Sequence, residues 1–315
     1  MAERRFATRL NSFRGLSSNG AISDDVLARV AGVPGISAVE LNFPQHVAGD
    51  GAELFARLGD LGLAVTALNL RFDVRRFQTG AFINPSAEVR QAAIQLCQNA
   101  VETAARNDVP HVILWLGPDG FDYPFQVDYA QLWEWEIEGL RQVAAHDVQT
   151  RVSIEYKPSD PRRVSLIRTM ADSLLAVQEA GLPNLGVTID VCHALMSGEH
   201  PAAAAALALR KGKLFGVHLN DGYGPADDGL TVGTVHPWQT LELLWELRRG
   251  EFKGTIYFDT FPDRVDPAAE TAANVDAILR FERMLDRIDP AQIHDVQALQ
   301  DGLAAIRMLH SLMGE

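Results

Sequence analysis

Val152-Ser-Ile-Glu-Tyr-Lys-Pro158 is the stretch that decides how this chain folds, because polar and apolar side chains alternate along it. Successive side chains of a strand point to opposite faces. Ser153, Glu155 and Lys157 therefore share one face, and the apolar residues between them share the other. An apolar face needs a covering layer of helices, so we expect the acid and the amine to point into the interior of a closed sheet.

Short apolar runs of this kind recur along the chain, and runs with helical spacing separate them. The predicted strands are Phe6–Phe13, Ile36–Phe43, Leu63–Phe72, His111–Gly117, Arg151–Pro158, Leu185–Cys192, Leu214–Asn220 and Thr255–Thr260. Predicted helices include Asp24–Val33, Glu88–Ala105, Tyr129–Ala145, Leu166–Ala180, Pro201–Lys211 and Trp238–Arg249. Eight strand–helix units in a row predict parallel strands with crossover helices. No Gly-rich turn follows the first strand, which favours a (β/α)8 TIM barrel over an open doubly wound sheet.

A further helical stretch, Ala291–Met313, follows the eighth unit after Asp289-Pro290. We expect a barrel over residues 1–288 and a helical extension over residues 289–315 that packs on the barrel or on a neighbouring subunit. Three prolines are expected in the first turn of a helix, where a missing N–H costs nothing: Pro85, Pro201 and Pro237.

Composition and charge narrow the class of protein. The 315 residues carry 28 Lys and Arg against 41 Asp and Glu, a net charge of −13, and 47% of them are hydrophobic. This balance excludes disorder as the main state and argues against nucleic-acid or anionic-membrane partners. Two cysteines, Cys97 and Cys192, cannot build a disulfide framework, which predicts a reducing compartment. With no targeting or membrane-spanning segment in view, we expect a cytoplasmic protein.

Four side chains that bind metals well end four successive predicted strands: Glu155, Asp190, His218 and Asp259. The C-terminal ends of barrel strands meet at one mouth, so these side chains are expected to converge there. Three carboxylates so close would repel one another and raise their pKa values, and a cation resolves this. Mn²⁺ is the first expectation, with Mg²⁺, Co²⁺ or Zn²⁺ as alternatives. Taken singly, each acid could be a helix cap or an ion-pair partner, and the histidine an interior residue.

Four motifs resemble those of the xylose-isomerase-like barrels: Glu155-Tyr-Lys-Pro158, Asp190-Val-Cys-His193, His218-Leu-Asn-Asp221 and Asp259-Thr-Phe-Pro262. The resemblance spans roughly residues 6–285, is strongest to the bacterial L-rhamnose isomerase branch, and is weaker to the D-tagatose 3-epimerase branch. It implies that the four predicted ligands hold a structural, substrate-binding metal. It also implies that Lys157 touches the substrate oxygen near C1.

The same resemblance implies a second metal, bound by His193 and by two aspartates of an Asp-x-Asp loop. Here the loop reads Asp227-Asp228-Gly229, so the second aspartate position holds Gly229. Asp228 or Asp221 is the alternative ligand. We therefore expect a tight first metal and a second one that is weak, transient or absent. A solvated acidic turn is the competing interpretation of Asp227 and Asp228.

A single metal leaves an enediol route that needs a base and an acid, and Glu155 is expected to be the base. Lys157 and Asp227 are further catalytic candidates, as is His46, which the resemblance assigns to ring opening or to O5. The epimerase branch has a Glu where this chain has Asp259, which favours an aldose–ketose isomerase. The competing role of His46 is that of a solvent-facing loop histidine.

Substrate contacts are expected from four side chains: Asn69, Arg71, Trp115 and Phe121. The first two share a strand face and suit hydroxyl groups, although such an Arg can instead pair with a barrel carboxylate. The aromatic rings suit stacking on a sugar, although core packing is the competing role. His111 is expected to be structural and Cys192 to be a buried thiol. No Gly-rich nest or Arg/Lys cluster follows the last two strands, so we expect a small neutral sugar as substrate.

These patterns predict a metal-dependent sugar isomerase that interconverts a free aldose and its ketose. The enzymatic alternatives are a ketose 3-epimerase and enediol or elimination chemistry on a modified sugar or glycoside. The non-enzymatic alternative is a sugar-binding barrel or a subunit of a complex. Deoxyribonuclease relatives of the fold are disfavoured, since they carry three Zn²⁺ ions and a basic DNA face. By analogy with other barrels, we expect a homo-oligomer.

Overall fold

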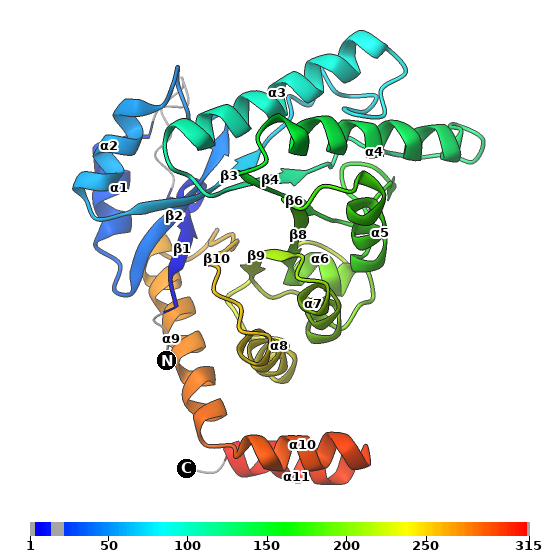
Figure 1. Ribbon diagram of the computed structural model, residues 1–315. Helices are drawn as coiled ribbons and strands as arrows, with labels where there is room; N and C mark the ends of the chain where they lie inside the picture. Colours follow the sequence, from blue (N-terminus) through cyan, green and yellow to red (C-terminus); the bar gives the residue numbers. More distant parts are fainter. Residues whose placement is uncertain (1–3, 14–21, 314–315) are drawn as a thin grey trace.

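A computed structural model describes residues 4–13 and 22–313, and eight parallel strands in it close into a barrel (Figure 1). The strands are β1 (Phe6–Arg9), β2 (Ile36–Phe43), β3 (Ala64–Leu70), β4 (His111–Trp115), β6 (Arg151–Glu155), β8 (Leu185–Asp190), β9 (Leu214–Leu219) and β10 (Ile256–Phe258). Neighbours in sequence are neighbours in the barrel, and β1 pairs with β10 to close it. The predicted (β/α)8 barrel and its eight strands are confirmed.

Helices cover the outside of the barrel (Figure 1). They are α1 (Asp24–Ala31), α2 (Ala52–Asp60), α3 (Ala87–Arg106), α4 (Tyr129–His146), α5 (Met170–Ala180), α6 (Val191–Met196), α7 (Pro201–Arg210), α8 (Pro237–Arg249) and α9 (Pro267–Asp286). A single 3-10 turn, η1 (Leu10–Phe13), follows β1. Two short strands, β5 (Gly120–Phe121) and β7 (Val164–Ser165), pair antiparallel in the loops after β4 and β6.

Some boundaries differ from the sequence predictions for local reasons. The first strand ends at Arg9, where η1 begins, and β8 ends at Asp190, whose side chain accepts a hydrogen bond from the His193 N–H and starts α6. Pro201 and Pro237 open their helices as predicted. The prediction for Pro85 was wrong, because Ser86 caps α3 and places the proline outside the helix.

The C-terminal extension is helical as predicted, but it consists of two helices, α10 (Pro290–Leu299) and α11 (Gly302–Met313). Gln300 ends α10 in a left-handed conformation with a φ of 51°. The Asp301 side chain then accepts hydrogen bonds from the first turn of α11. Figure 1 shows the two helices side by side beyond the end of α9. Among the described residues, no helix has the length and apolarity to cross a membrane.

The alternation along β6 determines what enters the barrel. Val152 and Ile154 belong to the large apolar core of the molecule. Ser153 lies in the barrel interior, where its hydroxyl is 2.7 Å from His111 Nε2 and 2.6 Å from Thr188 Oγ1. Burial lowers the pKa of His111 to about 3, so this imidazole is neutral and structural. The polar interior of the barrel therefore begins well below its mouth.

A pair of buried carboxyl groups, Asp119 and Glu136, lies behind the wall formed by β4 and β6. Asp119 accepts hydrogen bonds from the N–H groups of Ala81 and Phe82. Burial, together with the charge of Asp119, raises the pKa of Glu136 well above its ordinary value. Burial also raises the pKa of Asp119 to about 6. The pair thus keeps a proton in the folded protein that both groups lose more easily in the unfolded chain.

A raised pKa in the folded state contributes stability that is present at low pH and lost as pH rises. The free energy of unfolding should therefore fall as pH rises from 3.8, the ordinary value of Asp119, through about 6, its value in the folded protein. The contribution of Glu136 is lost from 4.5 upward, over a range that extends further because its pKa is raised well above that value. Glu136→Gln keeps the shape and removes the titration, so it should flatten this decline and stabilise the protein at pH 8 by on the order of 1 kcal/mol. Urea denaturation at several pH values measures the free energy of unfolding of both proteins.

Glu134→Gln, on the exposed side of the same helix, is the matched control and should leave the decline in place. An unchanged pH dependence in Glu136→Gln would contradict the protonated pair.

Candidate metal centre

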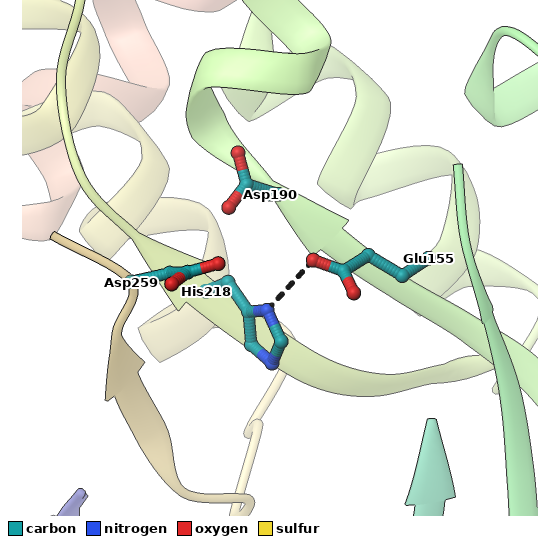
Figure 2. A group of neighbouring side chains, drawn as sticks. All are labelled: Glu155, Asp190, His218 and Asp259. Atoms are coloured by element: carbon teal, nitrogen blue, oxygen red, sulfur yellow. Dashed lines mark hydrogen bonds and ion pairs between the residues drawn. The ribbon is translucent and has the colours of Figure 1, made fainter. Parts of the chain in front are cut away.

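The four predicted metal ligands converge at the C-terminal mouth of the barrel. Glu155 ends β6, Asp190 ends β8, His218 lies near the end of β9, and Asp259 follows β10 (Figure 2). One ligand atom from each lies within 4.8 Å of the others. All four side chains are buried, and none is more than 6% exposed. The closure of the barrel brings together residues that are far apart in the sequence.

The His218 ring is held by a carboxylate at each nitrogen. Its Nδ1 is 2.9 Å from Glu155 Oε1, and its Nε2 is 3.2 Å from Glu40 Oε2. Asn69 donates a hydrogen bond to the same Glu40 oxygen at 3.0 Å. A carboxylate on the far nitrogen of a histidine orients that ring toward a metal in many metalloproteins. Asn69 thus contacts Glu40 through its Nδ2, while its Oδ1 accepts no hydrogen bond from any described residue, and its contact with a substrate hydroxyl stays a prediction.

Burial and neighbouring charges together set the pKa values of the clustered side chains. Burial alone raises the pKa of Glu155, but the imidazole of His218 outweighs it and lowers the pKa to about 2. Burial lowers the pKa of His218, but Glu155 and Glu40 outweigh it and hold that pKa well above its usual value. Burial raises the pKa of Asp190 to about 7, and the neighbouring carboxylates reinforce the effect. Such a cluster binds positive charge strongly.

The donor set fits a divalent cation. It offers three carboxylates and one imidazole, the ligand types that suit Mn²⁺, Mg²⁺, Co²⁺ or Zn²⁺. Glu155 Oε2 is buried and accepts no hydrogen bond from any described residue, and an unpaired buried carboxylate oxygen is costly. Asp190 also caps α6 through the His193 N–H at 3.0 Å, so its helix-capping role and a ligand role coexist. The residues can therefore hold one metal ion.

Beside this cluster, Lys157, Asp227 and His193 form a chain of contacts. Lys157 Nζ lies 3.0 Å from Asp227 Oδ2, and His193 Nε2 lies 3.2 Å from the same oxygen. Burial lowers the pKa of Lys157, but Asp227 and Asp160 outweigh it and raise the pKa above the ordinary value. Lys157 is therefore an ammonium group that points into the mouth of the barrel, next to Glu155.

The residues predicted for a second metal do not all come together. Asp228 turns away, since its Oδ2 accepts a hydrogen bond from the Tyr223 N–H at 2.7 Å. The alternative ligand Asp221 is engaged by the N–H groups of Val235 and His236 at 2.8 Å each and by the His236 ring. Neither carboxylate lies with His193 and Asp227 in a cluster that could hold a metal. Asp228 as a ligand of a second metal stays a prediction.

Packing leaves no room for a side chain at Gly229, where the Asp-x-Asp loop would have its second aspartate. Gly229 has a φ of 57°, a backbone conformation that side chains rarely adopt. A Cβ atom there would lie 2.3 Å from the Phe261 ring. Cys192 lies near Asp190 and Asp227, but burial raises the pKa of its thiol, which donates to the carbonyl of Asp221. As predicted, Cys192 is a buried thiol.

A cavity of about 160 Å³ lies against the cluster and the ammonium group. Its lining comprises Arg9, Arg71, Trp115, Glu155, Lys157, His193, Asp227, Asp259 and Phe261. The volume is below that of pockets for drug-sized ligands and suits a single sugar unit. Arg71 and Trp115 thus face the cavity, as the sequence predicts for substrate-binding residues. Sequence reasoning missed Arg9, Phe261 and Glu40, although Glu40 has the signal of an acid on the inward face of a strand.

Two other predicted residues have structural roles. His46 is buried, its Nδ1 accepts from the Asn42 N–H at 3.0 Å, and its Nε2 is 2.7 Å from Asn11 Oδ1. Burial, with Arg71 and Arg9 nearby, lowers the pKa of His46 to about 4. Phe121 packs edge-on against Tyr129 at 5.0 Å and does not line the cavity. His46 is neither solvent-facing nor free for ring opening, and Phe121 does not stack on a ligand there.

Comparison with known proteins agrees with this architecture. A family model described as "Xylose isomerase-like TIM barrel" matches residues 27–281. A xylose isomerase from Thermus thermophilus is 26% identical over 216 residues, which are 66% of this chain and 56% of that protein. The match thus spans little more than half of that relative's length.

Two solved structures share the fold at low identity. The crystal structure of a D-tagatose 3-epimerase-like protein superposes with a TM-score of 0.68 at 18% identity, over 89% of this chain and 99% of that one. A 3-keto-D-glucoside 4-epimerase from E. coli superposes with a TM-score of 0.60 at 20% identity, over 79% of this chain and 90% of that one. Together with the family match over most of the barrel, the closed eight-stranded sheet and its mouth place this chain in the xylose isomerase-like TIM barrel family.

Proposed function

We propose that this protein is a metal-dependent isomerase that interconverts a free aldose and its ketose. The observation that carries the proposal is the cavity that Lys157 shares with Glu155 and Asp259, two members of the buried four-residue cluster that could hold a metal. A non-catalytic sugar-binding barrel would not need a buried ammonium group beside a metal centre. The specific resemblance to the L-rhamnose isomerase branch stays a prediction, as does the homo-oligomer.

A bound divalent cation would polarise the oxygen atoms of the sugar at C1 and C2. Lys157 would donate a hydrogen bond to the carbonyl oxygen at C1, where negative charge develops as the C–H bond at C2 breaks. Glu155, which lines the cavity together with Lys157, would take the proton from C2 and return it to C1. Lys157 and Asp227, 3.0 Å apart, would move the proton from the oxygen at C2 to the oxygen at C1.

A ketose 3-epimerase, or enediol and elimination chemistry on a modified sugar or glycoside, is the second candidate. It is favoured by the fold shared with a D-tagatose 3-epimerase-like protein and with a 3-keto-D-glucoside 4-epimerase. Asp259 argues against it, because its carboxylate lies with the other ligands and 3.3 Å from Arg9 Nε. A 3-epimerase that uses two bases needs a second one free to reach a substrate carbon, and Asp259 is committed elsewhere.

Substitutions of the proposed ligands and of Lys157 should have different effects on metal retention and on turnover. Glu155→Gln and Asp259→Asn each remove a charged ligand, so both variants should lose bound metal and activity. Lys157→Met removes only the ammonium group, so it should keep the metal and lose turnover by roughly 100-fold or more. Elemental analysis of dialysed protein and activity assays measure the two quantities.

Glu53→Gln, an exposed acid on α2, is the control and should behave like the natural protein. A metal-free Glu155→Gln protein with full activity would contradict the proposal.

Because no aspartate fits at Gly229, where the second metal would need one, we predict one tightly bound metal per chain. Calorimetric titration with Mn²⁺ should show one equivalent of high affinity, and any second event should be at least about 100-fold weaker. Asp227→Asn should leave the tight equivalent in place, because Asp227 is outside the four-residue cluster. Two tight equivalents, one of them lost in Asp227→Asn, would show that His193 and Asp227 suffice for a second metal.

The reaction itself is tested by NMR of free pentoses and hexoses incubated with the protein and Mn²⁺ in D₂O. Aldose–ketose conversion with deuterium incorporated at C1 or C2 is the expected result, since a base exchanges the transferred proton with solvent. Conversion without deuterium would replace proton transfer by a hydride shift. Deuterium at C3 would favour the epimerase instead. The absence of conversion for every sugar tested would contradict the proposed isomerase.

A further inference from the structure

Arg71, which directly follows β3, is a cation in the cavity that makes no ion pair with any described residue, although its charge helps to lower the pKa of Glu155. Its backbone N–H donates to the Phe43 carbonyl at 2.8 Å, which fixes the chain at the mouth. The guanidinium lies over the Trp115 ring, 5.6 Å from its centroid, and lines the cavity. No hydrogen bond or ion pair joins its side chain to any residue in 4–13 or 22–313. An arginine pairing with a barrel carboxylate, the competing role in the sequence analysis, is not observed.

The other cations of the cavity are paired. Lys157 contacts Asp227 at 3.0 Å and Asp160 at 3.2 Å. Arg9 lies 3.3 Å from Asp259 and stacks over the Phe261 ring at 4.5 Å. Arg71 therefore differs from its neighbours in having a free, positively charged edge.

Among the described residues, no carboxylate of the mouth lies within ion-pair distance of Arg71, including the oxygens of Glu155, Asp227 and Asp259 that accept no hydrogen bond. Glu40 and Glu155 hold the His218 ring, and Asp227 is held by Lys157. Asp190 accepts from Asn220 at 2.9 Å. His46 offers no negative charge either, since both of its ring nitrogens are hydrogen-bonded. A ligand that reaches the free edge of Arg71 can thus supply its direct ion-pair partner.

A half-buried guanidinium without a partner has lost part of its hydration and gains most from an ionised ligand. Its planar fork matches a carboxylate through two parallel hydrogen bonds. A phosphate usually needs more donors, such as a Gly-rich nest at a helix N-terminus, and Arg71 stands alone. Carboxylate is therefore the anion that fits best.

We propose that Arg71 binds the carboxylate of an acidic sugar, so that the preferred substrate is a sugar acid such as a hexuronate. The inference rests on the proposed function, because the sugar end that reacts must still reach the metal cluster and Lys157. It departs from the neutral sugar predicted from the sequence, and the two expectations are separated by the same experiment.

The experiment uses the full chain loaded with Mn²⁺ and matched ligands. D-glucuronate and D-galacturonate are compared with D-glucose, D-galactose and glucose 6-phosphate, by calorimetry for binding and by NMR for conversion. The uronates should bind at least about 10-fold more tightly than the matched hexoses, and only their affinity should fall with added salt. Arg71→Met should remove the preference, so that the uronates lose about 10- to 100-fold more affinity than the matched hexoses.

Arg75→Met, an exposed arginine four residues further on, is the matched control and should retain the preference. Metal content of each variant shows that the cluster is intact. Equal affinity for uronates and hexoses, or a preference for the phosphate, would overturn the carboxylate proposal while leaving the isomerase proposal standing if a hexose is converted. Uronate binding that depends on Arg71, without conversion of any sugar, would support the carboxylate site and contradict the isomerase.

Discussion

The structure depends on the burial of three carboxylates around one imidazole at the mouth of a closed barrel. Such a cluster is costly in a low-dielectric interior unless positive charge holds it together. His218, between Glu155 and Glu40, can supply that charge as an imidazolium, and a divalent cation bound by the neutral imidazole would supply it instead. The cavity, the ammonium group and the proposed chemistry all follow from the position of this cluster.

Much of the fold and the clustering of four side chains at the mouth can be predicted, because both depend on short patterns. The alternation along Arg151–Pro158 identifies which side chains enter the barrel, and barrel closure then brings successive strand ends to one place. Glu155, Asp190, His218 and Asp259 could therefore be grouped without coordinates. Exact strand ends are harder, because the helix cap that Asp190 makes ends β8 earlier than the apolar pattern does.

Other features of the site depend on contacts that no local pattern contains. Glu40 approaches His218 from the other side of the barrel, and Phe261 fills the space over Gly229. The sequence places His46 in a loop, yet its ring is buried and both of its nitrogens are hydrogen-bonded. Phe121 reads as a ring near the mouth, yet it pairs with Tyr129 on the outside of the cavity. Each of these outcomes is a matter of tertiary packing.

The central claim is that the four clustered side chains bind a single divalent cation. A crystal structure of the protein grown with Mn²⁺, with anomalous scattering data, tests it most directly. The account predicts one strong anomalous peak in contact with Glu155, Asp190, His218 and Asp259. A mouth without such a peak, or a sole strong peak between His193 and Asp227, would contradict it.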